Sequence, residues 1–136
     1  MAADGGRGMT GERMGFQCVV LRCVPRVDRE EFLNVGVVLY CQQSDFLQAR
    51  WRVDEARLSA LAPGLDVAAV CAALEAVQAV CRGDESAGEA AREPIGTRFG
   101  FVKAPRSTVV QPGPVHGGST NDPSAELDRL LDRLVG

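Results

Sequence analysis

The segment NVGVVLYC, residues 34–41, constrains the fold most, because nearly every position in it is apolar. A half-exposed strand alternates apolar and polar side chains, whereas a short run that is apolar throughout is typical of a strand covered on both faces. Gly36 interrupts the run, and a glycine inside a strand indicates a bulge or a close approach of another backbone. We therefore expect a doubly covered strand with a backbone irregularity at Gly36.

Two further strands are predicted before and after this segment. Residues 16–24 are mostly apolar and β-branched and end before a proline, which cannot donate a ladder hydrogen bond. Residues 46–53 alternate in character, so every second residue from Leu47 to Val53 is expected to face the core. The polar residues 42–45 are predicted to form the hairpin turn between the second strand and the third.

Three helices are predicted from capping residues and apolar stripes. Asp54 can cap a short helix that ends near Ala62. Asp66 can cap a longer helix that ends near Cys81, in which apolar residues three and four positions apart form one face. Near the C-terminus, Asp122 precedes a proline at the first helical position, and four leucines then form a single stripe.

The remaining segments are predicted to be less regular. Residues 98–110 are expected to be extended, and residues 111–121, rich in proline and glycine, are expected to form a loop. Residues 82–96 are predicted to be a mobile, exposed, acidic loop, and residues 1–14 a disordered tail. The predicted fold is a single α+β domain over residues 15–136. In it, three or four mainly antiparallel strands pack against about three helices that cover one side of the sheet.

Composition narrows the function classes. The chain has 136 residues, a net charge of −3 and a pI near 5.2, which fits one domain and argues against a dedicated nucleic-acid-binding protein. No apolar run reaches the ~18 residues that a membrane span needs, and no apolar core follows a basic start as in a signal peptide. We therefore expect a cytoplasmic protein that does not bind membranes, and the composition disfavours nucleic-acid binding.

The chain contains five cysteines, namely Cys18, Cys23, Cys41, Cys71 and Cys81. They include no Cys-x-x-Cys pair, whereas zinc sites use ligands at short, paired spacings. We therefore expect core cysteines that behave as small apolar side chains, and we predict neither a metal site nor a cofactor.

A basic segment stands out against the acidic background. Residues 98–121 contain Arg98, Lys103 and Arg106 but no acidic residue, so the segment carries +3 and the rest of the chain −6. The segment also contains the only histidine, His116, and glycines that lead into the capped helix. A glycine-rich loop before a helix can present N–H groups to an anion, although neither nucleotide-binding fingerprint is present.

Arg22 is unusual because it lies among apolar residues in a predicted strand. A charged group in such a strand either faces solvent or pairs with an acid, and Glu31 is the candidate partner.

The sequence has no Gly-x-Ser-x-Gly motif, and its paired carboxylates are adjacent in sequence, where side chains diverge. These features favour a protein that is not an enzyme.

Two separated motifs resemble an uncharacterised bacterial family, DUF3037. The first consists of Leu21-Arg22, Val24-Pro25, Glu31 and the run from Asn34 to Leu39, and the second is the closing segment over residues 98–135. Two glycines and a serine follow His116 where the family has Thr-Gly, so the loop is expected to be more flexible here. The resemblance implies no established activity. It does imply a protein partner, because genes of such proteins often lie beside genes for HipA-like kinases.

The matching motif residues are the candidates for a shared site: Arg22, Glu31, Asn34, Arg106, Gln111 and His116, with Gly36 and Asp122 as residues that could be purely structural. The first candidate function is a non-enzymatic binding or accessory module that partners a HipA-like kinase. The alternative is a binder of a phosphate- or nucleotide-type anion, or a small enzyme, that uses the basic Arg106–His116 loop. Single-stranded nucleic-acid binding is the weakest hypothesis, since only Phe99 and Phe101 offer aromatic platforms.

Overall fold

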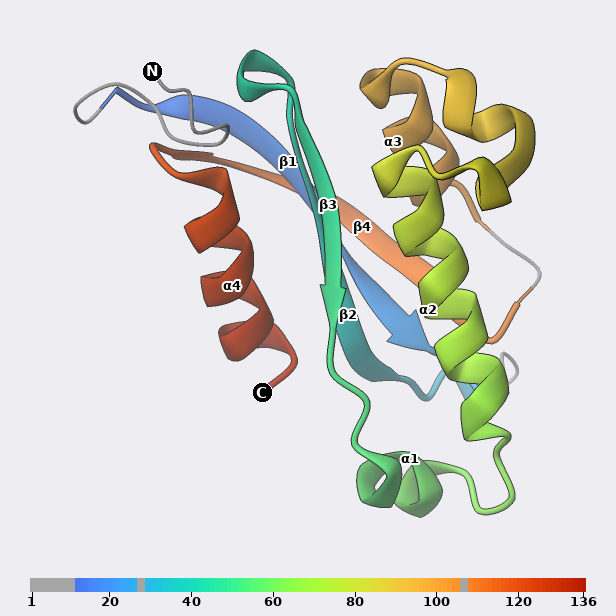
Figure 1. Cartoon of the computed structure of the whole chain (residues 1–136). Coiled ribbons are helices and arrows are strands. Elements are labelled where there is room, and N and C mark those ends of the chain that lie inside the picture. Colours follow the sequence, from blue (N-terminus) through green and yellow to red (C-terminus); the bar gives the residue numbers. More distant parts are fainter. Residues whose placement is uncertain (1–11, 27–28, 106–107) are drawn as a thin grey trace.

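The computed structural model describes residues 12–26, 29–105 and 108–136. Its centre is an open antiparallel sheet made of β1 (Met14–Cys23), β2 (Leu33–Cys41), β3 (Phe46–Trp51) and β4 (Val110–Thr120) (Figure 1). The strand order is β3-β2-β1-β4, so the first three strands form a meander and the fourth returns to pair with β1. The predicted α+β class is confirmed, and the predicted sheet of three or four mainly antiparallel strands has four.

The strand β2 lies inside the sheet and is buried on both faces, as its apolar sequence predicts. Val35 and Val38 belong to one buried cluster, whereas Val37 and Leu39 belong to another. The predicted hairpin turn after β2 is also present, as the 3-10 helix η2 (Gln42–Ser44). The apolar pattern of the sequence therefore predicts β2 and the turn after it correctly.

The glycine in β2 marks both a bulge and a close approach. The pairing with β1 skips Val35, because the partners of Leu21 and Arg22 lie two residues apart in β2. A Cβ atom added at Gly36 would lie 2.9 Å from the carbonyl oxygen of Arg50 in β3. Both alternatives that the sequence offers for Gly36 are thus confirmed.

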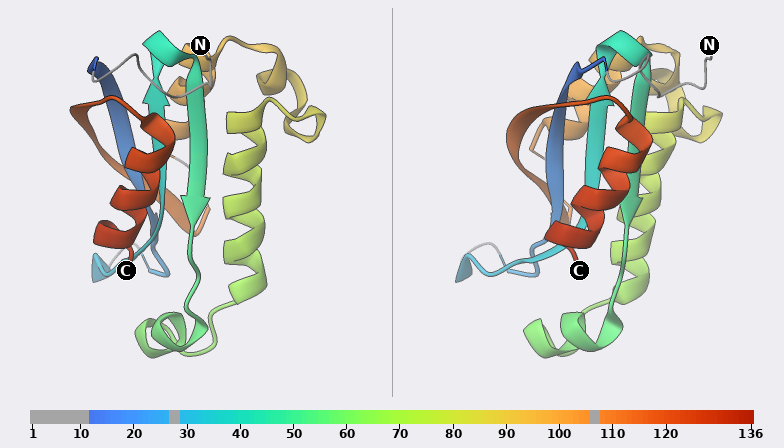
Figure 2. Two further views of the ribbon diagram at one scale, coloured as in Figure 1. Left: turned by 60° about the vertical axis from the view of Figure 1, so that its left-hand side comes forward. Right: turned by 90° about the vertical axis from the view of Figure 1, so that its left-hand side faces the viewer.

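Helices cover both faces of the sheet, so the prediction of a single covered face is wrong (Figures 1 and 2). The helices α2 (Val67–Arg82) and α3 (Ile95–Lys103) pack on one face, and α4 (Pro123–Leu134) packs on the other, against β2 and β3. The physical reason is that β2 is apolar on both sides and each side needs a covering layer. The short helix α1 (Glu55–Leu61) leads into α2. None of the helices in the described ranges is long and apolar enough to cross a membrane.

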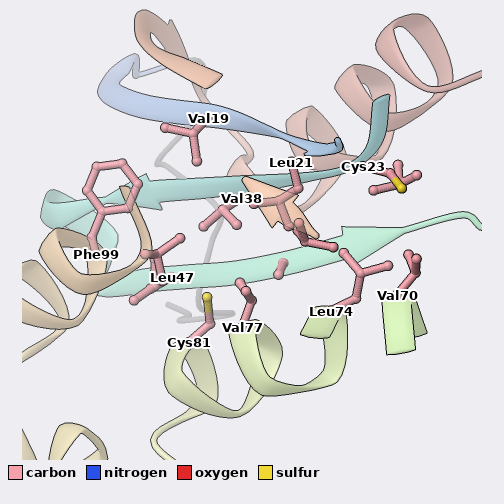
Figure 3. Close-up of a cluster of buried hydrophobic side chains, with 14 of the residues drawn as sticks. Val19, Leu21, Cys23, Val38, Leu47, Val70, Leu74, Val77, Cys81 and Phe99 are labelled. Atoms are coloured by element: carbon pink, nitrogen blue, oxygen red, sulfur yellow. The ribbon is translucent and has the colours of Figure 1, made fainter. Parts of the chain in front are cut away.

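Two apolar cores result from this arrangement. Figure 3 shows the larger one, in which Leu21 and neighbouring sheet residues face Leu74 and Val77 of α2. The second core lies under α4 and includes three leucines of the predicted stripe: Leu127, Leu130 and Leu131. Phe46, which the alternation in β3 places on the outer face, is buried in this second core.

Carboxylates cap three helices at the positions that the sequence predicts. The side chains of Asp54, Asp66 and Asp122 accept hydrogen bonds from the backbone N–H three residues later, at 3.1, 3.1 and 3.2 Å. Such caps typically contribute about 1 kcal/mol each to stability. Gly83 ends α2 in the left-handed conformation, as its position after the helix predicts.

The extended segment predicted over residues 98–110 is wrong over residues 98–103, because α3 occupies residues 95–103, and the next strand begins only at Val110. Phe99 and Phe101 are two positions apart, which imitates the period of a strand. In the structure Phe99 and Val102 are buried and Phe101 is exposed, which is the pattern of one helix face. Ile95 extends that face toward the same core.

The proline- and glycine-rich loop predicted over residues 111–121 is wrong, because these residues form most of β4. β4 is an edge strand that pairs with β1 on one side. An edge strand tolerates Pro112 and Pro114, since half of its backbone groups need no ladder partner. The aromatic ring of Phe16 lies over Gly118, where an added Cβ would be 2.7 Å from a ring carbon.

Two segment predictions are only partly addressed by the structure. Residues 82–96 contain short 3-10 turns, η3 (Glu85–Arg92), where a loop was expected, and the predicted mobility of this segment stays a prediction. Met14 is buried at the start of β1, so the sheet begins inside the predicted tail. Residues 1–11 of that tail lie outside the described residues.

Candidate functional site

Three of the predicted site residues lie side by side on neighbouring strands. Arg22 of β1 is paired with Asn34 of β2 on one side and with Gln111 of β4 on the other. We call these three residues the Arg22 row. Directly opposed residues in a sheet point to the same face and lie close enough to act on one ligand. The fold therefore unites candidates that are almost ninety positions apart in the sequence.

The Arg22 row points to the face of the sheet that carries α4. Leu21 and Cys23, on either side of Arg22, face the α2 core, and side chains alternate along a strand. The Nδ2 group of Asn34 donates a hydrogen bond to the carbonyl oxygen of Leu134 at 3.1 Å, so the row lies at the C-terminal end of α4. Figure 2 shows this helix end and the β1–β2 connection at the same end of the sheet.

The guanidinium group of Arg22 is packed against an aromatic ring and against backbone. Its Cζ lies 4.2 Å from the centre of the Phe32 ring, which is a cation–π contact. A Cβ added at Gly113 of β4 would lie 3.0 Å from the same Cζ, so glycine leaves the room that the guanidinium occupies. These contacts hold the charged group in one place on the sheet.

The hydrogen-bonding capacity of the Arg22 row is not fully used. Nε of Arg22 and Oδ1 of Asn34 are buried and have no hydrogen-bond partner among the described residues. The ion pairs found in those residues use other arginines and leave Arg22 without a carboxylate. A fixed guanidinium with unused donors is well suited to bind a carboxylate or a phosphate.

Glu31 does not pair with Arg22, so the partner that the sequence suggests is wrong. Its carboxylate lies 3.0 Å from Nε of Arg29, and both side chains are about half exposed. The two residues are close in the β1–β2 connection, and a local pair of this kind contributes little to stability. Among the described residues, the ion-pair partner of Glu31 is therefore Arg29 and not Arg22.

His116 is exposed on β4, away from the Arg22 row, and its cross-strand neighbour is Cys18. Burial raises the pKa of the Cys18 thiol, the charge of Glu126 raises it further, and the charge of Arg133 lowers it. A thiol with a raised pKa stays protonated at neutral pH and is a poor nucleophile. The imidazole and the thiol thus do not form an activated pair. Arg106, the remaining candidate, lies outside the described residues.

The local structure expected for an anion-binding loop is absent from β4. Backbone groups of this strand pair with β1 over Val110–Thr120, and they are not gathered into a loop. At the N-terminus of α4, the Asp122 carboxylate already accepts a hydrogen bond from Ala125. The Arg22 row, and not the segment before α4, therefore brings the predicted residues together.

The family model described as "Protein of unknown function (DUF3037)" matches residues 19–135. The chain belongs to the DUF3037 family. The match confirms the resemblance seen in the sequence, and it covers all three residues of the Arg22 row. No curated protein and no solved structure matches the chain. The function of this DUF3037 protein is therefore argued from its site.

The five cysteines of this DUF3037 protein form no disulfide with one another, and four of them are buried. This confirms the prediction that they act mainly as core residues. The described residues contain no group of three or more His, Cys, Asp or Glu side chains placed to hold a metal ion.

We expect Cys71, which is partly exposed, to react first with iodoacetamide in the native protein at neutral pH. Cys18 and Cys23 should stay unlabelled, because burial blocks access and raises the pKa of both thiols. Mass spectrometry after timed labelling measures the order, and labelling in denaturing guanidinium should modify all five. Equal rates for Cys18 and Cys71 in the native protein would contradict the burial of Cys18.

Two residues of the site were not found from the sequence of this DUF3037 protein. Phe32 lies in a polar connection, where a single aromatic residue forms no periodic pattern. Its position between Glu31 and the apolar run of β2 is nevertheless a sign that its side chain is exposed. Gly113 lies in a segment that was predicted to be a loop. Its role depends on the pairing of β4 with β1, which no local pattern reveals.

Proposed function

We propose that this chain is a non-enzymatic binding module that recognises an acidic group of a partner protein at Arg22. The proposal rests on how the Arg22 guanidinium is packed and paired. It is fixed against Phe32, it has an unpartnered Nε, and it pairs with no described carboxylate. A carboxylate of a partner supplies the opposite charge to the guanidinium.

The surroundings of Arg22 favour a protein over a small molecule. In the described part of the chain, the cavities of about 1000, 630 and 230 Å³ have no member of the Arg22 row in their linings. Phe32, directly beside Arg22, is 45% exposed. Arginine and aromatic residues are the types that dominate the energetics of protein interfaces. An open surface with these two side chains fits a protein partner.

The partner that we propose is a HipA-like kinase, on the basis of the family membership and the gene neighbourhood that it implies. A cytoplasmic, accessory role is part of the same proposal. The alternative of a phosphate- or nucleotide-binding loop over residues 106–116 is less well supported. It was motivated by the basic segment without acidic residues and by a glycine-rich loop before the last helix, and residues 110–116 belong to a strand.

The test is a calorimetric titration of a purified HipA-like kinase with the wild-type chain and with Arg22→Gln. We expect saturable binding by the wild type and at least about tenfold weaker binding by the variant, because the paired, charge-assisted hydrogen bonds of the guanidinium are lost. Arg22→Lys keeps the charge but not the planar pair of donors, and its affinity should lie between those of the other two proteins. The matched control is Arg29→Gln, which removes an exposed arginine that already pairs with Glu31.

The outcomes separate the two parts of the proposal. A wild-type chain that does not bind the kinase overturns the kinase as the partner. A kinase that binds Arg22→Gln as tightly as the wild type overturns Arg22 as the contact. Thermal unfolding of each variant shows whether it is folded, so that a lost interaction is not confused with a lost fold.

A further inference from the structure

A second feature of the molecule, independent of the Arg22 row, is a cavity of about 1000 Å³ beside the edge strand β3. Residues of η2, β3, α2, α3 and the start of α4 line it. In Figure 1 β3 runs between α4 on one side and α2 on the other. A smaller cavity of about 630 Å³ adjoins it and shares Asp45, Ile95 and Arg98.

Arg98 is a fixed cation in the wall of both cavities. Its Nη1 donates hydrogen bonds to the carbonyl oxygens of Val80 and Cys81, at 3.1 and 2.9 Å, at the end of α2. The same atom would lie 2.8 Å from a Cβ at Gly83, so the left-handed glycine that ends α2 also makes room for Arg98. Nε of Arg98 is buried and has no hydrogen-bond partner among the described residues. The guanidinium is thus anchored on one side and unsatisfied on another.

The carboxylates that line the larger cavity are mostly engaged elsewhere. Asp128 lies 3.1 Å from Nη1 of Arg50 in an ion pair, and Asp122 caps α4. Asp45 then shares the lining with two further cations, Arg98 and the exposed Arg82. The lining as a whole contains three arginines and three aspartates. Within the described residues neither Arg98 nor Arg82 has an ion pair, so no direct contact with a carboxylate neutralises either charge.

A hydroxyl group adds to the unused donors at the cavity. Oγ of Ser44 in η2 is buried without a hydrogen-bond partner among the described residues, and Ser44 lines the same cavity. Buried polar groups in folded proteins are normally satisfied, so unsatisfied ones indicate a missing partner. Nε of Arg98 and Oγ of Ser44 are two such groups in the lining of one cavity, and an oxyanion is a chemical complement for both.

We propose that the cavity beside β3 binds a small molecule through its phosphate or carboxylate group, which is held by Arg98, Arg82 and Ser44. Arginine forks recognise both oxyanions in the same way. The volume is in the range of ordinary ligand sites. The polar side chains of Gln48 and Gln78, also in the lining, would contact the rest of the ligand.

The experiment is a titration of the isotope-labelled full chain followed by NMR, with sodium phosphate in one arm, sodium acetate in a second and sodium chloride in a third. We expect a saturable shift of the backbone amides of Ser44 and Gly96 and of the Nε–H of Arg98 with phosphate, acetate or both. Chloride at equal ionic strength should give none. The responding arm identifies which oxyanion the cavity accepts.

Variants distinguish the cavity from general surface charge. Arg82→Gln should weaken the saturable binding about threefold or more, as expected for one exposed charge. Arg98→Lys should weaken it about tenfold, because the planar fork is lost. The matched control is Arg92→Gln, an exposed arginine of η3 that does not line the cavity. It should bind like the wild type.

The outcomes test oxyanion binding in the cavity beside β3 independently of the Arg22 row. No saturable shift with either oxyanion overturns it, and so does equal binding by Arg82→Gln and the wild type. Arg82 is exposed, so its replacement keeps the test valid even if Arg98→Lys disturbs the end of α2. Arg22→Gln should bind both oxyanions here as the wild type does. This result separates the cavity from the proposed protein-binding role.

Discussion

The substitution Phe99→Ala should lower the free energy of unfolding by about 3–5 kcal/mol, the range for removing a buried aromatic side chain. Phe99 is 1% exposed and lies in the core between α3, α2 and the sheet. Its ring also stacks on Tyr40, with 5.1 Å between the ring centres. Urea unfolding followed by circular dichroism measures the change.

The matched control is Phe101→Ala in the same helix. Phe101 is 44% exposed, so its removal leaves no buried cavity and should cost less than about 1 kcal/mol. In a strand, residues two positions apart share a face, and the two substitutions would then cost similar amounts. A similar loss for both variants would therefore contradict the helix α3.

The substitution Gly36→Ala should destabilise the protein by about 2 kcal/mol, within the range for overpacking a filled interior. The new Cβ would lie 2.9 Å from the carbonyl oxygen of Arg50 and 3.0 Å from Cβ of Trp51. Both atoms belong to the adjacent strand, so the sheet has to move at the bulge. Equilibrium unfolding in urea gives the difference in free energy.

Gly15→Ala is the control for the glycine substitution, because it lies in a strand of the same sheet. The nearest atom to a Cβ there is the carbonyl oxygen of Gly118, at 4.0 Å, which is ordinary contact. We expect a change of no more than about 0.5 kcal/mol. If Gly36→Ala proved equally harmless, the close packing of β2 against β3 would be disproved.

The sequence predicts those elements whose pattern is local and strong. The runs that form β1, β2 and β3 and the capped helices α2 and α4 are recognised from apolar period and carboxylate caps. The helix α3 was missed because it is short, contains Gly96 and Gly100, and carries two phenylalanines at the period of a strand. The strand β4 was missed because an edge position tolerates prolines that a central strand would exclude.

The candidate site was predictable in its residues but not in its geometry. The family motifs name Arg22, Asn34 and Gln111, whereas the row that they form depends on the register of three strands. That register includes a bulge beside Arg22 and an irregularity in the pairing of β1 with β4. The cavity beside β3 depends in addition on α3, which the pattern of the sequence did not reveal.

The strand order has a consequence for the way the chain folds. β1 can pair with β2 soon after both are synthesised, but its other neighbour, β4, is made about ninety residues later. During that interval one side of β1 stays unpaired, with its apolar residues open to mispairing with another chain. The sheet is thus completed only after nearly the whole polypeptide has been made. Contacts between residues so far apart in the sequence slow folding. In this molecule, the last strand and the helix that follows it finish the fold.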